Sequence, residues 1–162
     1  MSAGVVLRWL GCLTLAGLAK LAAVVLAPAV CWLAATPDRR HLRAPWQWME
    51  TLDWDMAGDP PWRARRLIGT DPLSWINRTR WLWRNGAQAV AYGICGASAT
   101  DPTRDADGSW YRLTLTDSAF YWRADWPVSG RRVEVRAGWK LNYQIEGRCK
   151  VALSIRIRKL EA

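Results

Sequence analysis

The stretch LGCLTLAGLAKLAAVVLAPAVC, residues 10–31, decides how the amino-terminal part of this chain folds. It contains 22 residues, of which only Lys20 carries a charge. Trp9 and Trp32 flank the stretch, and a helix that rises about 1.5 Å per residue separates them by roughly 35 Å. This distance matches a bilayer core with part of the headgroup layer, and tryptophan is enriched at both membrane interfaces. The stretch therefore predicts a membrane helix.

Lys20 lies at the middle of this predicted helix and is the main cost of inserting it. A central lysine costs about 2.5–3.5 kcal/mol on insertion scales, and the leucine and valine residues of the stretch return roughly 3–5 kcal/mol. A single transmembrane helix is therefore favoured by a narrow margin. Two alternatives remain open. One is a helix that lies in one leaflet or is buried in an oligomer, and the other is a signal peptide cleaved at Ala-Pro-Ala, residues 27–29.

Small residues recur every four positions on one face of the predicted helix, at Ala19, Ala23 and Ala27. Such a stripe lets a second helix approach closely, although an alanine-rich span also produces stripes by chance. Lys20 lies beside the stripe, and an oligomer would shelter it, or its long side chain would reach one membrane surface. We therefore predict that Ala19, Lys20, Ala23 and Ala27 form a helix-packing surface.

Basic residues on the two sides of the helix predict its orientation. Arg8 stands alone on the amino-terminal side, whereas three arginines follow the helix within a short segment. The positive-inside rule then places the carboxy-terminal part of the chain in the cytoplasm. The predicted membrane-interface residues are Trp9, Trp32, Arg39, Arg40 and Arg43.

The composition favours an anionic partner. The chain has 162 residues and a net charge of +9, with 19 Arg against 4 Lys. Arginine binds phosphate groups through two hydrogen bonds, so lipid headgroups and nucleic acid are both candidates. Since a membrane helix is already predicted, anionic lipid is the preferred partner and nucleic acid is disfavoured. The alternative is a solvated basic surface with no specific partner.

The 13 tryptophans are exceptional for this length, and many stand beside arginine, as in Trp62-Arg63 and Trp83-Arg84. Interleaved Trp and Arg suit a membrane interface, where an amphipathic ring and a cation share one depth. The alternative is a set of cation–π pairs inside a folded domain.

The sequence offers little material for catalysis or for a metal site. Four cysteines, at positions 12, 31, 95 and 149, lack the spacing of a metal knuckle or a redox motif, and His41 is the single histidine. Asp53, Asp55 and Asp59 lack the later ligands of a calcium loop, so we expect a turn in which they pair with Arg63, Arg65 or Arg66. No catalytic residue, metal or cofactor is predicted, and the protein is expected not to be an enzyme.

Three parts follow one another along the chain. Residues 1–35 form the apolar membrane helix, residues 36–70 a Trp- and Arg-rich juxtamembrane connector, and residues 71–162 a small α+β domain. Short helices are predicted at 46–52, 62–68 and 72–84, where Asp71 and Pro72 form a good helix start. Residues 87–97 are too short to span a bilayer and are expected to be buried, as helix rather than strand. Residues 98–109 are expected to be a loop.

The carboxy-terminal third shows the period of two that is typical of strands. Residues 132–145 and 149–158 alternate apolar and polar side chains around a turn at 146–148, and residues 110–116 and 119–126 form two earlier strands, with a turn near 117–118. The sequence thus predicts an α+β fold with a four-stranded antiparallel sheet. Its polar face is predicted to be a platform for phosphate groups, with an ordinary solvated face as the alternative. The anion-contact residues on this face are Arg132, Arg136, Lys140, Lys150, Arg156 and Arg158.

The order of several short motifs adds a resemblance. The apolar run is followed by Gly58-Asp59, by Trp62-Arg63, by RWLWRN at residues 80–85, by Ala91-Tyr92-Gly93 and by GWKL at residues 138–141. In this order the chain resembles a family of small uncharacterised proteins of tailed bacteriophages and prophages. It departs from that pattern at Asn85-Gly86 and around residues 53–57. The resemblance implies a phage context, and hence the inner membrane of an infected bacterium or the virion.

The leading hypothesis is a non-catalytic, phage-encoded, single-pass protein of the host inner membrane. Its basic, Trp-rich cytoplasmic domain would contact anionic lipid, another phage protein or a second copy of the chain. The main alternative is a virion structural protein, such as a capsid, connector or ejected component, whose apolar helix packs on neighbouring subunits. A lysis-related membrane protein and a nucleic-acid-binding module are further alternatives.

Overall fold

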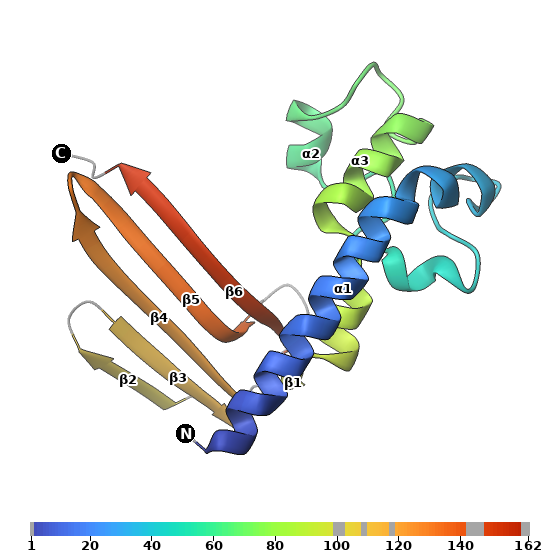
Figure 1. Cartoon of the computed structure of the whole chain (residues 1–162). Coiled ribbons are helices and arrows are strands. Elements are labelled where there is room, and N and C mark those ends of the chain that lie inside the picture. Colours follow the sequence, from blue (N-terminus) through green and yellow to red (C-terminus); the bar gives the residue numbers. More distant parts are fainter. Residues whose placement is uncertain (1, 99–102, 108–109, 117–118, 142–147, 160–162) are drawn as a thin grey trace. The chain divides into compact units, whose positions relative to one another are not determined.

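A computed structural model describes residues 2–98, 103–107, 110–116, 119–141 and 148–159 of the chain. The fold is α+β (Figure 1), as predicted, and begins with one long apolar helix. Shorter helical elements follow, and the carboxy-terminal third consists of strands. The helical elements are α1 (Ala3–Leu33), the 3₁₀ helix η1 (Trp46–Met49), α2 (Pro60–Arg65), α3 (Trp75–Asn85) and the π-helical segment η2 (Ala89–Ile94).

The helices α2 and α3 begin where side chains bind the free backbone N–H groups of their first turns. The Asp59 carboxylate accepts a hydrogen bond from the Trp62 N–H at 2.7 Å and caps α2. Ser74 caps α3, which therefore begins three residues later than predicted from Asp71-Pro72. The predicted helix at 46–52 is a single 3₁₀ turn, and the predicted buried segment at 87–97 contains η2.

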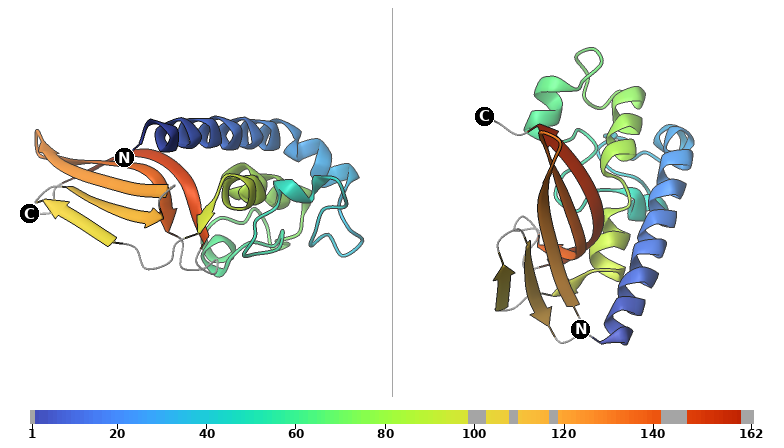
Figure 2. Two further views of the ribbon diagram at one scale, coloured as in Figure 1. Left: turned by 90° about the horizontal axis from the view of Figure 1, so that it is seen from below. Right: turned by 60° about the vertical axis from the view of Figure 1, so that its left-hand side comes forward.

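In the part of the chain that the structure describes, the sheet has six strands rather than the predicted four. Its spatial order is β1-β6-β5-β4-β3-β2, and every neighbouring pair is antiparallel. Three long strands, β4, β5 and β6, form its main body and bend along their length (Figure 2). The strands are β1 (Ala97–Ser98), β2 (Thr103–Asp107), β3 (Trp110–Thr116), β4 (Ala119–Val128), β5 (Arg131–Leu141) and β6 (Arg148–Lys159).

The error in strand number comes from the segment predicted as a loop, residues 98–109. Part of it is β2, which pairs with β3, and β1 pairs with the first residues of β6. Both strands lie at the edges of the sheet, and neither shows the apolar alternation by which the other four were recognised. The predicted turn at 117–118, the end of the predicted strand at 142–145 and the turn residues 146–147 lie outside the described residues.

By its contacts the chain divides into two compact units, and the predicted division at residues 35 and 70 stays a prediction. The helical unit is Leu15–Ile94, and the sheet unit combines Met1–Thr14 with Cys95–Ala162. In the helical unit, most of α1 shares one core with the later helices. That core consists of Ala23, Ala27, Val30, Cys31, Leu42, Met49, Met56, Trp62, Trp81, Leu82 and Ala87.

In the sheet unit, the start of α1 packs on one end of the sheet. The rings of Trp9 and Phe120 meet edge to face with centroids 5.9 Å apart, and Phe120 meets Trp139 in the same way at 5.9 Å. The Arg8 guanidinium lies 5.3 Å from the centre of the buried Trp139 ring, and the Trp139 indole donates a hydrogen bond to the Cys95 carbonyl at 2.7 Å. Aromatic and cation–π contacts therefore hold this end of the sheet against the helix.

Candidate membrane-binding surface

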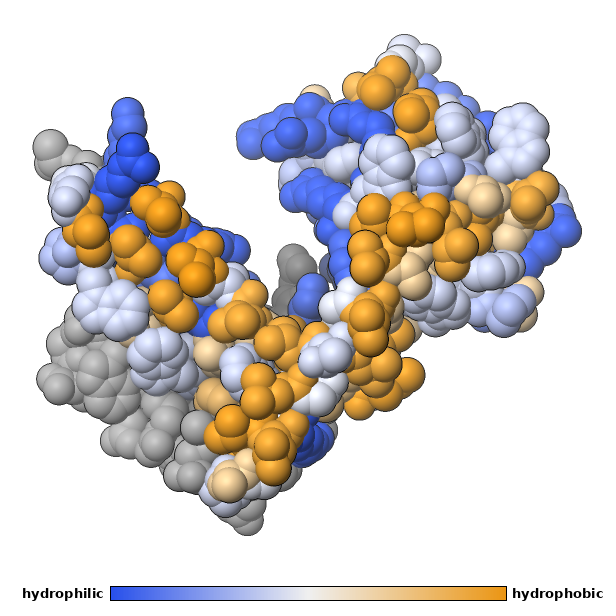
Figure 3. Space-filling model, viewed as in Figure 1, coloured by the Kyte–Doolittle hydropathy of each residue, from blue (hydrophilic) through white to orange (hydrophobic). Residues whose placement is uncertain are grey.

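One face of α1 is an exposed apolar stripe that runs along most of the helix. Its members recur at intervals of three, four, seven or eight residues, so they share one side of a helix with 3.6 residues per turn. Leu18 and Leu21 are 60% and 61% exposed, and Val25 is 68% exposed. Figure 3 shows apolar side chains gathered along α1. The apolar stripe consists of Leu7, Leu10, Leu18, Leu21, Val25 and Trp32.

The opposite face of α1 packs inside the chain. Ala23 and Ala27 are fully buried in the core of the helical unit with Trp81 and Leu82 of α3, and Ala19 packs against the edge of that core. The small residues predicted to receive a second helix therefore lie against α3 of the same chain. Whether the same face also packs on a second copy stays a prediction.

Lys20 also belongs to the inward face of α1. Its ammonium donates a hydrogen bond to the Leu82 carbonyl at 3.0 Å, near the carboxy-terminal end of α3. The last carbonyls of a helix carry partial negative charge, so this is a favourable place for a cation. Because the single charge of the run is directed to α3, the apolar stripe contains no charged residue.

Two tryptophans of α3 bind the backbone of α1. Pro28 has no N–H, so the Val24 carbonyl lacks its usual partner within the helix. The Trp83 indole donates to this carbonyl at 2.9 Å, and the Trp75 indole donates to the Pro28 carbonyl at 2.8 Å. These contacts were not predicted, although a proline inside an apolar helix signals a carbonyl that needs an outside donor. With Lys20, they make three hydrogen bonds between the two helices.

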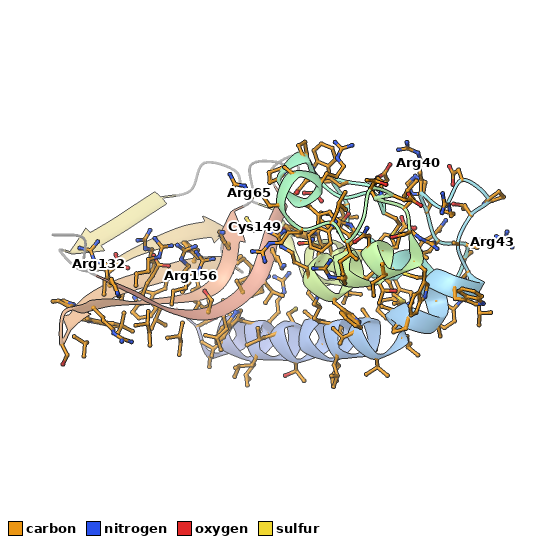
Figure 4. The ribbon with its side chains drawn as sticks, turned by 90° about the horizontal axis from the view of Figure 1, so that it is seen from above. Arg40, Arg43, Arg65, Arg132, Cys149 and Arg156 are labelled. Carbon is orange, nitrogen blue, oxygen red and sulfur yellow. The ribbon has the colours of Figure 1, made fainter. Side chains whose placement is uncertain are left out.

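The predicted membrane-interface residues have different surroundings. Trp32 is 73% exposed at the end of the stripe and meets Trp75 edge to face, whereas Trp9 is half-buried against Phe120. All three arginines that follow α1 are exposed, and two form ion pairs. Arg39 pairs with Asp71 at 3.1 Å, and Arg40 pairs with Asp55 at 2.6 Å. Figure 4 labels Arg40 and Arg43 in the connector.

The acidic residues of the connector serve local structure. Asp55 accepts a hydrogen bond from the Ala57 N–H at 2.8 Å and pairs with Arg40, rather than with Arg63, Arg65 or Arg66. Asp59 caps α2. In the part of the chain that the structure describes, no group of three or more His, Cys, Asp or Glu side chains is placed to hold a metal ion.

Some tryptophans form internal cation–π contacts with arginines that are distant in the sequence. The buried Trp62 ring lies 5.6 Å from the Arg80 guanidinium and 5.7 Å from that of Arg84, both on α3. This contact stabilises the fold and does not require a membrane. Four tryptophans of the helical unit are more than 40% exposed and are therefore accessible to a lipid surface: Trp32, Trp54, Trp75 and Trp83.

The six predicted anion-contact residues share one face of the sheet by register. Arg132 pairs with Arg158 across β5 and β6, and Lys140 pairs with Lys150. Arg156 lies opposite Glu134, next to the pair formed by Arg136 and Ser154. Figure 4 labels Arg132 and Arg156 on this part of the sheet. Their contact with an anion stays a prediction.

A buried carboxylate changes the charge of this face. Glu134 is 2% exposed and lies 2.7 Å from both the Arg123 and the Arg136 guanidinium, so Arg136 already has an anionic partner. Burial alone would raise the pKa of Glu134, but the close arginines outweigh it and the pKa lies below its ordinary value. Burial and the charges of Arg136 and Arg156 lower the pKa of Lys140.

These features define an α+β protein with a candidate membrane helix. Among the described residues, α1 is the one helix long and apolar enough to cross a membrane, judged by length and composition. The chain belongs to a family of unknown function (DUF7338), whose family model matches residues 1–161. No curated protein and no solved structure matches the chain.

Proposed function

We propose that the protein is a non-catalytic membrane protein that α1 attaches to a bilayer. The observation that carries this proposal is the apolar stripe. Its leucines and valine are 45–69% exposed, and the stripe contains no charged residue. Exposed apolar surface of this extent is costly in water and favourable in lipid. The exposed arginines that follow α1 would contact anionic headgroups.

The contacts of α1 with α3 favour a helix that lies along one leaflet over the single-pass arrangement. Lys20, Val24 and Pro28 each bind α3, which carries Arg80 and Arg84. A span over residues 10–31 would draw these arginines toward the hydrocarbon core, at about 2.5–3.5 kcal/mol for each one at the centre, or would break the three hydrogen bonds. An in-plane helix keeps them and still buries the apolar stripe.

The cellular setting follows from the resemblance to phage proteins. We propose that the bilayer is the inner membrane of the host bacterium and that residues 34–162 lie on its cytoplasmic side, where anionic headgroups face the arginines that follow α1. Reporter fusions at each terminus test this arrangement. We expect both termini in the cytoplasm, whereas a single-pass helix places the amino terminus in the periplasm, and a periplasmic carboxy terminus contradicts the proposed orientation.

Vesicle flotation of the full chain tests membrane attachment directly. The variant Leu21→Lys places a charge in the apolar stripe and should reduce the floated fraction severalfold. Ile68→Lys is the matched control, because Ile68 is 55% exposed, close to the 61% of Leu21, and lies outside α1. Equal flotation of the two variants, or a wild-type chain that is freely soluble and monomeric without detergent, would exclude the proposal.

A virion structural protein is the second candidate. Its supporting observation is that both units expose apolar side chains, which neighbouring subunits of a particle would cover as well as lipid would. Mass spectrometry separates the two candidates, because a host-membrane protein is absent from purified particles and present in the membrane fraction of infected cells.

A further inference from the structure

The long strands of the sheet present one apolar face whose residues form rows across β4, β5 and β6. Strand alternation and register define these rows. Trp122 and Trp126 meet with ring centroids 6.2 Å apart, which agrees with their places on one face. From the inner end toward the hairpin tip, the rows are Trp122–Ala137–Leu153, Ala124–Val135–Ile155, Trp126–Val133–Ile157 and Val128–Arg131–Lys159.

The start of α1 covers only the inner end of this face. Phe120 and Trp139 lie there beneath Trp9 and Arg8, and Val151 next to Trp139 is 3% exposed. Farther along β6, the exposed fraction rises to 53% at Leu153, 68% at Ile155 and 60% at Ile157. We call the three apolar rows beyond Val151 the open face. Figure 3 shows its apolar side chains gathered over the strands.

Cations border the open face at its outer end. Arg131 and Lys159 stand in the same row by register, and both are exposed. Every exposed charged side chain in residues 119–140 and 149–159 is basic, because Asp125 is half-buried beside Arg123 and Glu134 is buried. Trp126, 41% exposed, supplies an amphipathic ring beside the cations.

This charge pattern selects among the surfaces that could cover the open face. A second copy packed face to face would bring the cationic ends of two sheets together, and residues 119–140 and 149–159 offer no exposed carboxylate to pair with them. An anionic lipid surface supplies hydrocarbon for the isoleucines and negative charge for Arg131 and Lys159. Apolar residues with a tryptophan and basic residues at their border are typical of surfaces that enter the interfacial layer.

We propose that the open face is a second membrane-contact surface, which enters an anionic leaflet with Ile155 and Ile157 in the hydrocarbon and Arg131 and Lys159 at the headgroups. This proposal rests on the membrane attachment proposed above and adds a partner for the sheet. It also reverses the sequence-based expectation, because the apolar face of the sheet, rather than its basic face, meets the lipid.

An environment-sensitive fluorophore on neighbouring residues of β6 tests the proposal. The full chain carries Cys12→Ser together with either Ile157→Cys or the matched control Arg156→Cys, since the other native cysteines are buried. The two labelled sites are adjacent and lie on opposite faces of one strand. On vesicles that contain phosphatidylglycerol, the label at position 157 should shift to shorter wavelength and be quenched by lipids with a doxyl group in the acyl chain. The label at position 156 should stay in water.

Removal of the cations sharpens the test. Arg131→Gln and Lys159→Gln should each raise the amount of phosphatidylglycerol vesicles needed for half-maximal shift at position 157 by about fivefold, if each cation contributes as juxtamembrane basic residues do. Vesicles of phosphatidylcholine alone should abolish this difference between the variants and the wild-type chain.

The outcomes separate this proposal from the one on α1. If the protein floats with vesicles while both labels remain in water, the proposed membrane contact of the open face is overturned and the attachment through α1 is left intact. Protein that does not float overturns the proposed function. Equal shifts at both positions also overturn the proposal, because they show no sidedness. A disulfide between the substituted 157 positions of two copies identifies a second copy as the covering surface and overturns it as well.

Discussion

The helical unit closes its core, whereas the sheet unit leaves part of its apolar surface open. In the helical unit Trp81 is 2% exposed, and Leu42, Met49 and Leu82 are fully buried. In the sheet unit, Ile155 on a central part of β6 is 68% exposed. Backbone pairing alone is therefore enough to form a long hairpin. The burial of its side chains requires a second layer of structure. That layer is complete in one unit and reaches only the inner end of the apolar face in the other.

The α1 helix combines both situations in a single element. Its inward face contributes Ala23 and Ala27 to a closed core, and its outward face carries the apolar stripe. A helix that is apolar on all sides is typical of burial in a large protein or in a membrane. Here one face has a partner in the chain, and the opposite face provides the surface for the proposed lipid contact.

The largest expected effect separates the closed core from the open face. Trp81→Ala should lower the free energy of unfolding by about 3–5 kcal/mol, because it empties a buried site. Ile155→Ala should change it by no more than about 0.5 kcal/mol, because the side chain is already exposed. Urea unfolding of both variants in one mild detergent measures the contrast. Equal losses would show that Ile155 is buried by a partner under those conditions.

The next effect concerns the polar face of the sheet. Glu134→Gln should lower the free energy of unfolding at neutral pH by about 1–3 kcal/mol, because two guanidinium groups lose their anionic partner. The pKa of Glu134 is lowered in the folded state, so its contribution is complete above the ordinary carboxyl pKa of 4.5 and disappears as the pH falls through the lower folded-state value.

Thermal unfolding as a function of pH checks this expectation. The stability difference between wild type and Glu134→Gln should shrink as the solution is acidified. Asp53→Asn, a change at an exposed carboxylate, serves as the control and should leave the pH profile of the wild type almost unchanged. A difference that stays constant down to strong acid would contradict the assignment of the ion pairs.

A smaller effect tests the inward direction of Lys20. Lys20→Met removes the hydrogen bond to the Leu82 carbonyl and should cost about 0.5–1.5 kcal/mol of unfolding free energy. Flotation with vesicles should remain at the wild-type level, because Lys20 does not belong to the apolar stripe. Increased flotation of this variant would show that Lys20 meets lipid, as a transmembrane span requires.

The smallest effect concerns the reactivity of the Cys149 thiol, which should differ between the folded and the unfolded chain. Burial raises the pKa of the Cys149 thiol to about 11, so only about one thiol in a thousand is ionised at pH 8. Iodoacetamide should therefore label Cys149 very slowly in the folded chain and rapidly in urea. Rapid labelling of the folded chain, read by peptide mass spectrometry, would show that the inner end of the sheet opens.

The strands that alternate apolar and polar residues could be recognised from sequence, because each one buries or exposes alternate side chains. β3 has its predicted bounds, and β4 and β6 differ by no more than two residues at either end. β2 could not be recognised, since its sequence TRDAD has no apolar alternation and forms a strand only by pairing with β3. The two residues of β1 likewise depend on β6.

The candidate surface was predictable in part for the same reason. The length and apolar character of α1 follow from adjacent residues, and so does the spacing of its alanines. The partner of Lys20 lies 62 positions away, and no local pattern indicates it. The ion pairs of Glu134 were also missed, because alternation predicts which face a residue occupies but not which long side chains fold over it.

The hydrogen bond from Trp83 to Val24 has a consequence for the evolution of this family. A proline at position 28 deprives one carbonyl of its donor, and an indole from another helix replaces it. Loss of either residue alone leaves a backbone or a side-chain group without its partner, whereas loss of both restores an ordinary helix. Positions 28 and 83 are therefore expected to covary among homologous sequences, with proline retained where tryptophan is retained.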